Sequence, residues 1–271
     1  MPSLYIVATP IGNLEDISPR AVRILREVKL IAAEDTRKTR ILLDKYEIKT
    51  PLTSYYEHNK IDKLDYILKQ LQEKDIAIVS EAGMPGISDP GYELVAAAIE
   101  KGFTIVPLPG PSAIITALAV SGLPTDRFIF IGFLPRRIGE RRQALTTVAS
   151  EAGTIIAYEA PHRIKEALND IIYVLGDRRI AVCRELTKIY EEVFRGTASE
   201  ALQHFNDPRG EFTLVIAGKS KEKPRLDDEV VKKLEVLQQA GVGAREAVAQ
   251  VVKETGLSKK EVYQAWLKLL S

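Results

Sequence analysis

The alternation of strand-like and helix-like segments constrains the fold of this 271-residue chain more than any other sequence feature. Short runs of β-branched and apolar residues are separated by segments with helical periodicity, one of which opens at Ser18 and Pro19. The strand-like runs cover residues 4–8, 30–33, 76–80 and 104–107 in the first part of the chain, and 128–132, 154–158, 180–184 and 212–217 in the second. This alternation predicts an α/β fold.

Turn residues and composition divide the chain further. Pro109, Gly110 and Pro111 interrupt the pattern, and an apolar helix begins at Ser112. We therefore expect two α/β domains, residues 1–111 and 112–218, because a chain this long exceeds one compact core. The lysine-rich stretch 219–227, with Pro224, has the composition of a linker.

The last segment, residues 228–271, shows helical periodicity of its apolar residues throughout. Two amphipathic stretches, 230–239 and 244–254, precede a Ser258-x-x-Glu261 capping box that opens a third helix. The short connection at residues 255–258 is typical of a helix-turn-helix. A small helical domain of this type is predicted.

Several classes of function are disfavoured by what the chain lacks. Net charge is +1, no apolar run is long enough to cross a bilayer, and the N-terminus lacks the features of a signal peptide, so we expect a cytoplasmic protein. Cys183 is the only cysteine, and His58, His162 and His204 lie far apart, so no metal site is expected. The sequence contains no phosphate loop, no clean G-x-G-x-x-G after a strand and no G-x-S-x-G elbow.

Three loops rich in glycine and proline follow predicted strands. They read VATPIGNL at 7–14, VSEAGMPGISDPG at 79–91 and VPLPGPSAIITAL at 106–118. Ligands of open α/β sheets bind beyond the carboxyl ends of strands, where glycines allow close backbone approach. The loops therefore predict a small-molecule site, although tight turns alone would need the same residues. Asp89, followed by Pro90, is better explained as a helix N-cap, and capping alone could also explain Ser112.

Charged residues also gather next to the predicted strand ends. Charged side chains that converge on one site suit proton transfer and anion binding. Taken one at a time, each is more simply explained as a salt-bridge partner or a helix cap. Asp35 or Thr36, for example, would cap the next helix. The residues are Glu34, Asp35, Arg37, Glu81, Glu159, His162, Arg163, Arg184, Glu185 and Lys188.

Two basic groups could contact nucleic acid. Arg136, Arg137, Arg141 and Arg142, with Arg127 nearby, form the densest basic cluster, although a solvated helix start would look the same. The predicted last helix carries a second group, in which the aromatic residues could equally pack inward while the lysines face solvent. That group is Lys259, Lys260, Tyr263, Trp266 and Lys268.

The ordered motifs resemble the tetrapyrrole methylase superfamily, in particular its members that methylate RNA of the small ribosomal subunit. The match covers about residues 4–218 and includes TPIGNL, AAEDTR, SEAGMPGISDPG, PGPSA, LPTDRF with GFLPRR, YEAPHR, RELTK and GEFTLVIAG. The resemblance implies two α/β domains with S-adenosylmethionine (SAM) between them, a homodimer, and methylation of the ribose 2′-hydroxyl of a decoding-region cytidine. The partner would be 16S rRNA or the 30S subunit.

The resemblance also assigns cofactor contacts to positions of this sequence. These are Pro10, Ser80, Glu81, Ala82, Gly83, Ile87, Ser112, Ala113, Tyr158, Glu159, Leu186, Thr213 and Leu214. Glu81 and Met84 stand where the family more often has Asp and Thr, which puts a side-chain role for position 81 in doubt while leaving backbone contacts unaffected.

A ribose hydroxyl is a weak nucleophile, so we hypothesise that Glu34 or Asp35 accepts its proton and that Arg37 and Arg163 hold phosphate. Arg136, Arg137, Arg141 and Arg142, with Lys259 and Lys260, would position the RNA. Two alternatives are a methyltransferase acting on a tetrapyrrole carbon, which would share fold and cofactor, and a nucleic-acid binder without catalysis.

Overall fold

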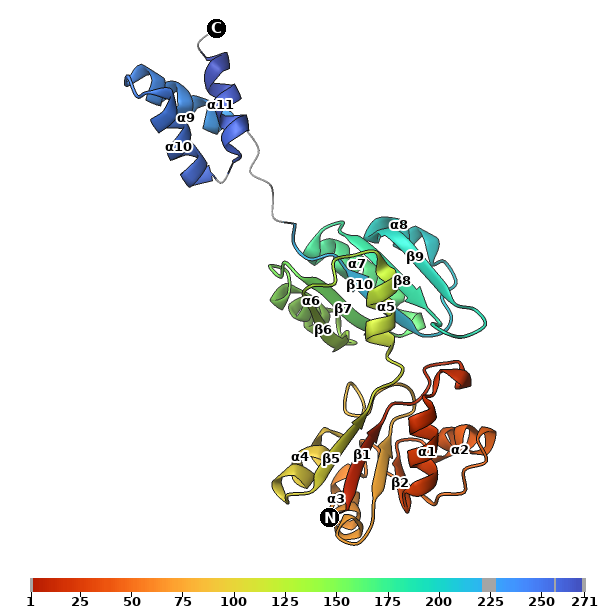
Figure 1. The fold of residues 1–271 in the computed structure, drawn as a ribbon. Helices are drawn as coiled ribbons and strands as arrows, with labels where there is room; N and C mark the ends of the chain where they lie inside the picture. Colours follow the sequence, from red (N-terminus) through yellow and green to blue (C-terminus); the bar gives the residue numbers. More distant parts are fainter. Residues whose placement is uncertain (1, 221–227, 256, 270–271) are drawn as a thin grey trace. The chain divides into compact units, whose positions relative to one another are not determined.

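The computed structural model describes residues 2–220, 228–255 and 257–269, with the side chains of residues 228 and 229 excepted. It contains two compact units, Met1–Lys219 and Ser220–Ser271. Figure 1 shows that the first unit holds two sheets with their own helices, and that the second is entirely helical in its described part. The predicted linker 219–227 lies outside the described residues except for residues 219 and 220.

The first sheet is parallel throughout, with the order β3-β2-β4-β1-β5. Its strands are β1 Ser3–Val7, β2 Leu30–Ala33, β3 Leu52–Ser54, β4 Ile76–Val79 and β5 Thr104–Leu108, and its helices are α1 Pro19–Glu27, α2 Thr36–Lys45, α3 Lys60–Leu71 and α4 Tyr92–Glu100, with the short η1 Leu14–Asp16. Every residue of β2 and β4 is buried, because helices cover both faces.

Successive side chains along β2 and β4 point to opposite faces of the sheet, so they belong to two different cores. Ile31 and Val79 belong to the cluster under α1 and α2, whereas Leu30 and Ile78 belong to the cluster under α3 and α4. Parallel strands buried on both faces place their carboxyl ends at one edge of the sheet, which is where the loops at 7–14 and 79–91 begin.

The second sheet is mixed, with the order β6-β7-β10-β8-β9. Only β6 and β7 are parallel; the other neighbours are antiparallel. The elements are α5 Ala113–Ser121, β6 Phe128–Phe133, α6 Ile138–Thr147, β7 Thr154–Glu159, η2 Pro161–Arg163, α7 Ile164–Leu175, β8 Arg179–Arg184, β9 Glu192–Thr197, α8 Ala198–His204 and β10 Phe212–Ile216. The predicted α/β class is confirmed for both sheets.

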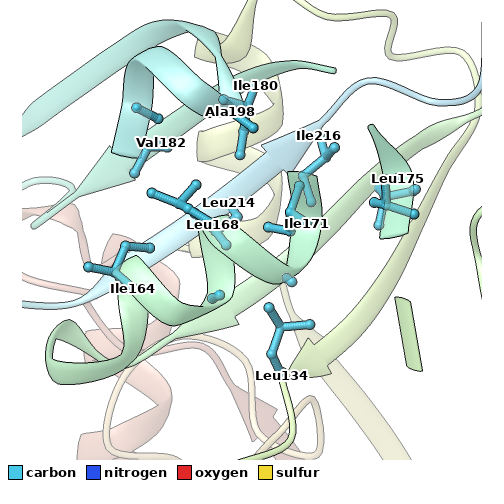
Figure 2. Close-up of a cluster of buried hydrophobic side chains, with 14 of the residues drawn as sticks. Leu134, Ile164, Leu168, Ile171, Leu175, Ile180, Val182, Ala198, Leu214 and Ile216 are labelled. Atoms are coloured by element: carbon cyan, nitrogen blue, oxygen red, sulfur yellow. The ribbon is translucent and has the colours of Figure 1, made fainter. Parts of the chain in front are cut away.

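Two apolar layers cover the faces of the second sheet. On one face Leu168 and Ile171 of α7 pack with Leu214 and Ile216 of β10 (Figure 2). On the other face α5 packs through residues such as Ala117, and the cluster there also takes Ile11, Cys183 and Leu186. Ile11 comes from the first loop of the chain, so this cluster joins the two sheets into one unit.

The helical unit consists of α9 Asp228–Gln239, α10 Ala244–Thr255 and α11 Lys259–Lys268. Its core contains Leu234, Val251, Val262 and Trp266, and none of its members comes from the α/β unit. The predicted capping box is confirmed, because the Ser258 hydroxyl accepts from the N–H of Glu261 and the Glu261 carboxylate accepts from that of Ser258. Gly256, in the predicted turn, lies outside the described residues.

Candidate functional site

A cavity of about 390 Å³ lies within the α/β unit and is lined by residues of both sheets. The second Gly/Pro loop contributes residues 81–84, 87 and 89, and β6, β7, β8 and β10 with neighbouring loop residues contribute most of the others. The lining residues are Ile11, Glu34, Glu81, Ala82, Gly83, Met84, Ile87, Asp89, Ser112, Ala113, Ile114, Phe133, Tyr158, Glu159, Ala160, Pro161, Cys183, Leu186, Glu211, Phe212 and Thr213.

This lining includes all but three of the residues to which the family resemblance assigned cofactor contacts. Pro10 is buried and precedes Ile11, which lines the cavity, and Leu214 lies in the core on the far side of β10. Ser80 is also buried, and its hydroxyl donates to the Gly83 carbonyl oxygen at 3.2 Å, so it supports the loop. Phe133, Cys183 and Glu211 also line the cavity, although the sequence analysis assigned none of them a cofactor contact.

A backbone bridge fixes the second loop against the first. The N–H of Thr9 donates to the Gly83 carbonyl at 2.9 Å, and the N–H of Gly83 donates to the Thr9 carbonyl at 3.0 Å. Gly83 has φ +86°, in the left-handed region that favours glycine. The pair therefore holds the backbone of residues 81–83 at the cavity wall.

The loop after β8 reaches the first loop from the opposite sheet. Glu185 and Thr187 have φ of +50° and +66°, unusual for non-glycine residues, and Leu186 between them lines the cavity. The N–H of Asn13 donates to Thr187 Oγ1 at 3.0 Å. Strained backbone of this kind persists where the surroundings enforce it, and it is concentrated at functional sites.

Five carboxylates line the cavity. Glu81 forms an ion pair with Lys38, Glu159 Oε1 lies 2.6 Å from Arg163 Nη2, and Glu211 Oε2 lies 2.9 Å from Lys188 Nζ. The remaining two, Glu34 and Asp89, form no ion pair with any residue that the structure describes. The cavity wall is thus acidic, which suits a cationic ligand.

Glu159 has an oxygen that lacks a partner. Its side chain is buried, Oε1 accepts from the N–H of Ala160 at 2.7 Å, and Oε2 has no hydrogen-bond partner among the described residues. Burial raises the pKa of this carboxyl, while the Ala160 N–H and the Arg163 charge oppose the rise. Arg163 Nε is also buried without a hydrogen-bond partner among the described residues, so both unpaired atoms belong to the Glu159–Arg163 ion pair.

The structure separates Glu34 from its neighbour Asp35. Glu34 lines the cavity, and its Oε2 accepts from the N–H of Glu81 at 2.9 Å. Asp35 is instead the N-cap of α2, and its carboxylate accepts from the N–H groups of Arg37 and Lys38, which lowers its pKa. Arg37 has a side chain that is 91% exposed. Of the predicted catalytic residues, therefore, only Glu34 lines the cavity.

The interpretation of Asp89 as a helix N-cap is wrong. Helix α4 begins at Tyr92 with Gly91 at the N-cap, and the side chain of Asp89 lines the cavity instead. Burial raises the pKa of Asp89 to about 7, with a further contribution from the charges of Glu34 and Glu81 and an opposing hydrogen bond from Ser80. Ser112 does cap its helix, α5, and it also lines the cavity.

The predicted set of RNA-contacting arginines needs two corrections. The Arg141 side chain is 1% exposed, and its Nε lies 2.7 Å from Asp170 Oδ2, so it is part of the core. Arg163 is 12% exposed, and its guanidinium is paired with Glu159 and donates to the Leu134 carbonyl. Arg136 and Arg137 are exposed, while Arg142 is shared between Asp170 and the Tyr173 ring.

Within the described residues, no three or more histidine, cysteine, aspartate or glutamate side chains are arranged to hold a metal ion. Burial raises the pKa of the Cys183 thiol to about 12, so this residue is protonated at neutral pH. None of the described helices is long and apolar enough to span a bilayer.

Comparison with known proteins identifies the family to which this chain is related. The model for tetrapyrrole (corrin/porphyrin) methylases matches residues 3–202. Proteins named ribosomal RNA small subunit methyltransferase I are 46% identical in Halalkalibacterium halodurans (97% of this chain, 94% of the relative) and 48% identical in Synechocystis (98% of each). A protein of that name in Thermotoga maritima is 51% identical over 222 residues, which are 81% of this chain and 100% of the relative.

Solved structures resemble the fold at low sequence identity. Uroporphyrin-III-C-methyltransferase from Thermus thermophilus superposes with a TM-score of 0.57 at 16% identity, covering 80% of this chain and 94% of the other. Diphthine synthase gives 0.61 at 14% identity, covering 79% and 90%. These similarities establish the shared fold.

Proposed function

Because this chain belongs to the tetrapyrrole methylase family, together with the ribosomal RNA small subunit methyltransferase I proteins that match nearly its whole length, we propose that it methylates RNA of the small ribosomal subunit. The methyl donor is SAM, and the acceptor is the ribose 2′-hydroxyl of a decoding-region cytidine in 16S rRNA. The observation that carries the proposal is the identity of 46–48% over 97–98% of the chain.

The cavity supports the choice of cofactor. Its volume of about 390 Å³ lies in the range of about 300–1,000 Å³ typical of small-molecule sites. SAM carries a sulfonium, an ammonium and an adenine, which match the acidic wall and apolar side chains such as Ile87 and Leu186. When bound, it supplies an electrophilic methyl group.

The residues of the chain then have two tasks. The backbone of 81–83 and the loop carrying Leu186 hold the donor and exclude water, and the cavity carboxylates stabilise a positive charge. Exposed Arg136, Arg137 and Arg37, with Lys259 and Lys260 of the helical unit, provide phosphate contacts that orient the RNA. We further propose that the protein is a cytoplasmic homodimer, as the resemblance to its family implies.

The decisive experiment is transfer of labelled methyl from SAM to small ribosomal subunits from cells lacking this protein, followed by mapping of the modified nucleotide. We expect label on one decoding-region cytidine, resistant to alkaline cleavage at its 3′ side because the 2′-oxygen is blocked. Label on a tetrapyrrole precursor and none on subunits or naked RNA would replace the proposal with the tetrapyrrole alternative.

Gly12→Ala is expected to weaken SAM binding about tenfold, or about 1.4 kcal/mol, measured by calorimetry. A Cβ at position 12 would lie 2.5 Å from Lys188 Cγ, 2.7 Å from Thr187 Oγ1 and 3.0 Å from the Leu186 carbonyl oxygen. The loop that carries Leu186 would have to move away from the cavity.

Gly139→Ala is the matched control, since a Cβ at that position of α6 meets no atom within 4 Å. It should bind SAM as the wild type does. Wild-type affinity in Gly12→Ala would show that the contact between the two loops does not shape the cofactor site.

A further inference from the structure

Resting on the proposed function, we propose that the loop between β3 and α3, residues 55–59, is a contact site for the substrate RNA, in which an unpaired base stacks on the ring of Tyr56. Arg37 and Arg40 of α2 hold the phosphates beside that base. The partner is thus a single-stranded RNA segment next to the nucleotide whose ribose enters the cavity. None of these three residues lines the cavity itself.

The β3–α3 loop lies at the same edge of the first sheet as the cavity. β3 is the edge strand next to β2, and the N–H of Tyr55 donates to the Ala33 carbonyl at 2.8 Å, directly before Glu34. The other four strands of this parallel sheet are each followed by a loop that contributes to the cavity lining, through Glu34 after β2, Glu81 after β4, Ile11 after β1 and Ser112 after β5. The loop after β3 therefore begins level with the cavity without lining it.

The cavity is open to solvent beside α2. Glu81 lines the cavity and is exposed, and it pairs with Lys38, an exposed residue of α2. Neighbouring strands of a sheet lie about 4.8 Å apart, so β3 is about 10 Å from β4 across β2. An RNA strand that brings a ribose to this opening and continues toward β3 passes over the exposed side chains of α2 and the β3–α3 loop.

Hydrogen bonds fix the conformation of the β3–α3 loop. Asn59 Oδ1 accepts from the N–H of Tyr56 at 2.8 Å, and Asn59 Nδ2 donates to Ser54 Oγ at 3.0 Å. Tyr55 is buried in the core under α3 and α4. The backbone is therefore held on both sides of Tyr56, and a contact that is ordered in advance costs less entropy when a ligand binds.

The ring of Tyr56 is accessible to a ligand. Tyr56 is 40% exposed, and the ring of His58, also exposed, lies edge-on to it with centroids 6.3 Å apart and an angle of 77° between the planes. The charge of Glu57, between the two rings, is offset by Lys60, whose Nζ lies 2.9 Å from Glu57 Oε1. Unpaired RNA bases stack on aromatic side chains, tyrosine and histidine included. Two exposed rings on a fixed loop offer such a stacking surface.

The exposed charges beside the loop match a phosphate backbone. α2 packs against β3, and its residues Arg37, Lys38 and Arg40 are all exposed. Lys38 pairs with Glu81, whereas Arg40 forms no ion pair with any residue that the structure describes. Arg37 Nη2 lies 3.5 Å from Asp35 Oδ2, and the other carboxylate oxygen of Asp35 accepts from two backbone N–H groups. Arg37 and Arg40 can therefore bind phosphate without breaking a buried ion pair.

The test measures the affinity of the protein for small ribosomal subunits from cells lacking it, with S-adenosylhomocysteine bound, and kcat and KM for their methylation with SAM. Tyr56→Ala should weaken binding by roughly 5- to 150-fold, the cost of one stacked base, and raise KM in proportion. Its kcat and SAM affinity should stay within about twofold of the wild type, because Tyr56 does not line the cavity. Tyr56→Phe keeps the ring and should bind like the wild type.

Matched variants separate stacking from charge. Tyr66→Ala removes a tyrosine of α3 with a similar exposed fraction, 44%, and should bind like the wild type. Arg40→Ala should weaken binding and reduce the slope of log affinity against log salt by about 0.7, the value for one phosphate of a single strand. Lys45→Ala, in the last turn of α2, should leave that slope unchanged, as should Tyr56→Ala, because stacking releases no counterions. Equal slopes in Arg40→Ala and Lys45→Ala would refute the phosphate contact.

Photo-cross-linking locates the contact without turnover. Tyr56 is replaced by p-azidophenylalanine, and the cross-linked nucleotide of the subunit RNA is mapped by primer extension. The cross-link should fall on an unpaired nucleotide next to the one that is methylated, and the same replacement of Tyr66 should give none there. A cross-link to a ribosomal protein, or to RNA remote from the methylated nucleotide, would place Tyr56 in another interface and overturn the inference.

The inference and the proposed function fail in different ways. If the wild type methylates small subunits and Tyr56→Ala binds them equally well, only the inference is wrong. The inference is also wrong if Tyr56→Phe binds as weakly as Tyr56→Ala, or if Tyr56→Ala loses its affinity for SAM, since the residue then acts through its hydroxyl or shapes the cavity. A wild type that neither binds nor methylates small subunits overturns the proposed function, and the inference with it.

Discussion

Asp170→Ala is expected to lower the free energy of unfolding of the α/β unit by about 3–5 kcal/mol. Asp170 is buried on α7 and accepts from Arg141 Nε and Arg142 Nε, each at 2.7 Å. Its loss leaves the Arg141 guanidinium, 1% exposed, without its buried carboxylate partner; the remaining one, Glu166, is 65% exposed and lies 3.4 Å away. A unit of this size should then melt roughly 10 °C lower, a change that urea titration and calorimetry can measure.

Two variants separate the charge effect from lost packing. Arg142→Ala removes a partner that is 38% exposed, so its cost should be about 1 kcal/mol. Arg141→Met combined with Asp170→Leu removes both buried charges and should recover most of the stability lost in Asp170→Ala. If Asp170→Ala unfolds within 1 kcal/mol of the wild type, the pair does not hold α6 against α7.

This ion pair shows where the sequence was insufficient. Arg136, Arg137, Arg141 and Arg142 look alike as a basic cluster, and only the fold reveals that Arg141 faces inward. Its partner Asp170 lies 29 residues away on α7, beyond any local pattern. The mean charge of a segment can be read from sequence, but the direction of each side chain depends on the helix that packs against it.

Most strands could be predicted because their burial is strong. Residues 30–33 and 76–79 are apolar throughout and buried on both faces, and their predicted limits differ from β2 and β4 by at most one residue. Strands β3 and β9 were not predicted. β3 has three half-buried residues, and β9 is an edge strand whose residues are mostly half-buried, so neither leaves a strong apolar pattern.

Within the site, the loops could be predicted from the sequence, but the direction in which their side chains point could not. The Gly/Pro composition of 79–91 indicated a loop at a strand end, and that loop lines the cavity. Asp89 followed by Pro90 has the local signature of a cap, yet positive φ at Ser88 and the contact between Gly86 and Gly91 delay the helix until Tyr92. Tertiary contacts overrode a local preference there.

Deletion of residues 220–271 is expected to leave SAM affinity and kcat unchanged while raising KM for small subunits by about 10- to 100-fold, since a tethered second contact multiplies affinity. The helical unit has its own core, so the α/β unit should fold without it. The α/β unit is 219 of 271 residues, or 81%, which is the share that the whole Thermotoga maritima relative covers. That relative carries the name ribosomal RNA small subunit methyltransferase I.

The contact is expected to run through Lys259 and Lys260, which are exposed on the first turn of α11. Cations at a helix N-terminus oppose the helix dipole, so their presence there favours a role with phosphate over a role in helix stability. Replacing both by alanine in the full chain should reproduce much of the rise in KM and reduce the slope of log affinity against log salt by about 1.4–1.8. Lys232→Ala, which removes an exposed lysine of α9, serves as the control. If the deletion raises KM and the double alanine variant does not, another surface of the helical unit contacts the RNA. If the deletion abolishes SAM binding, the helical unit belongs to the catalytic core.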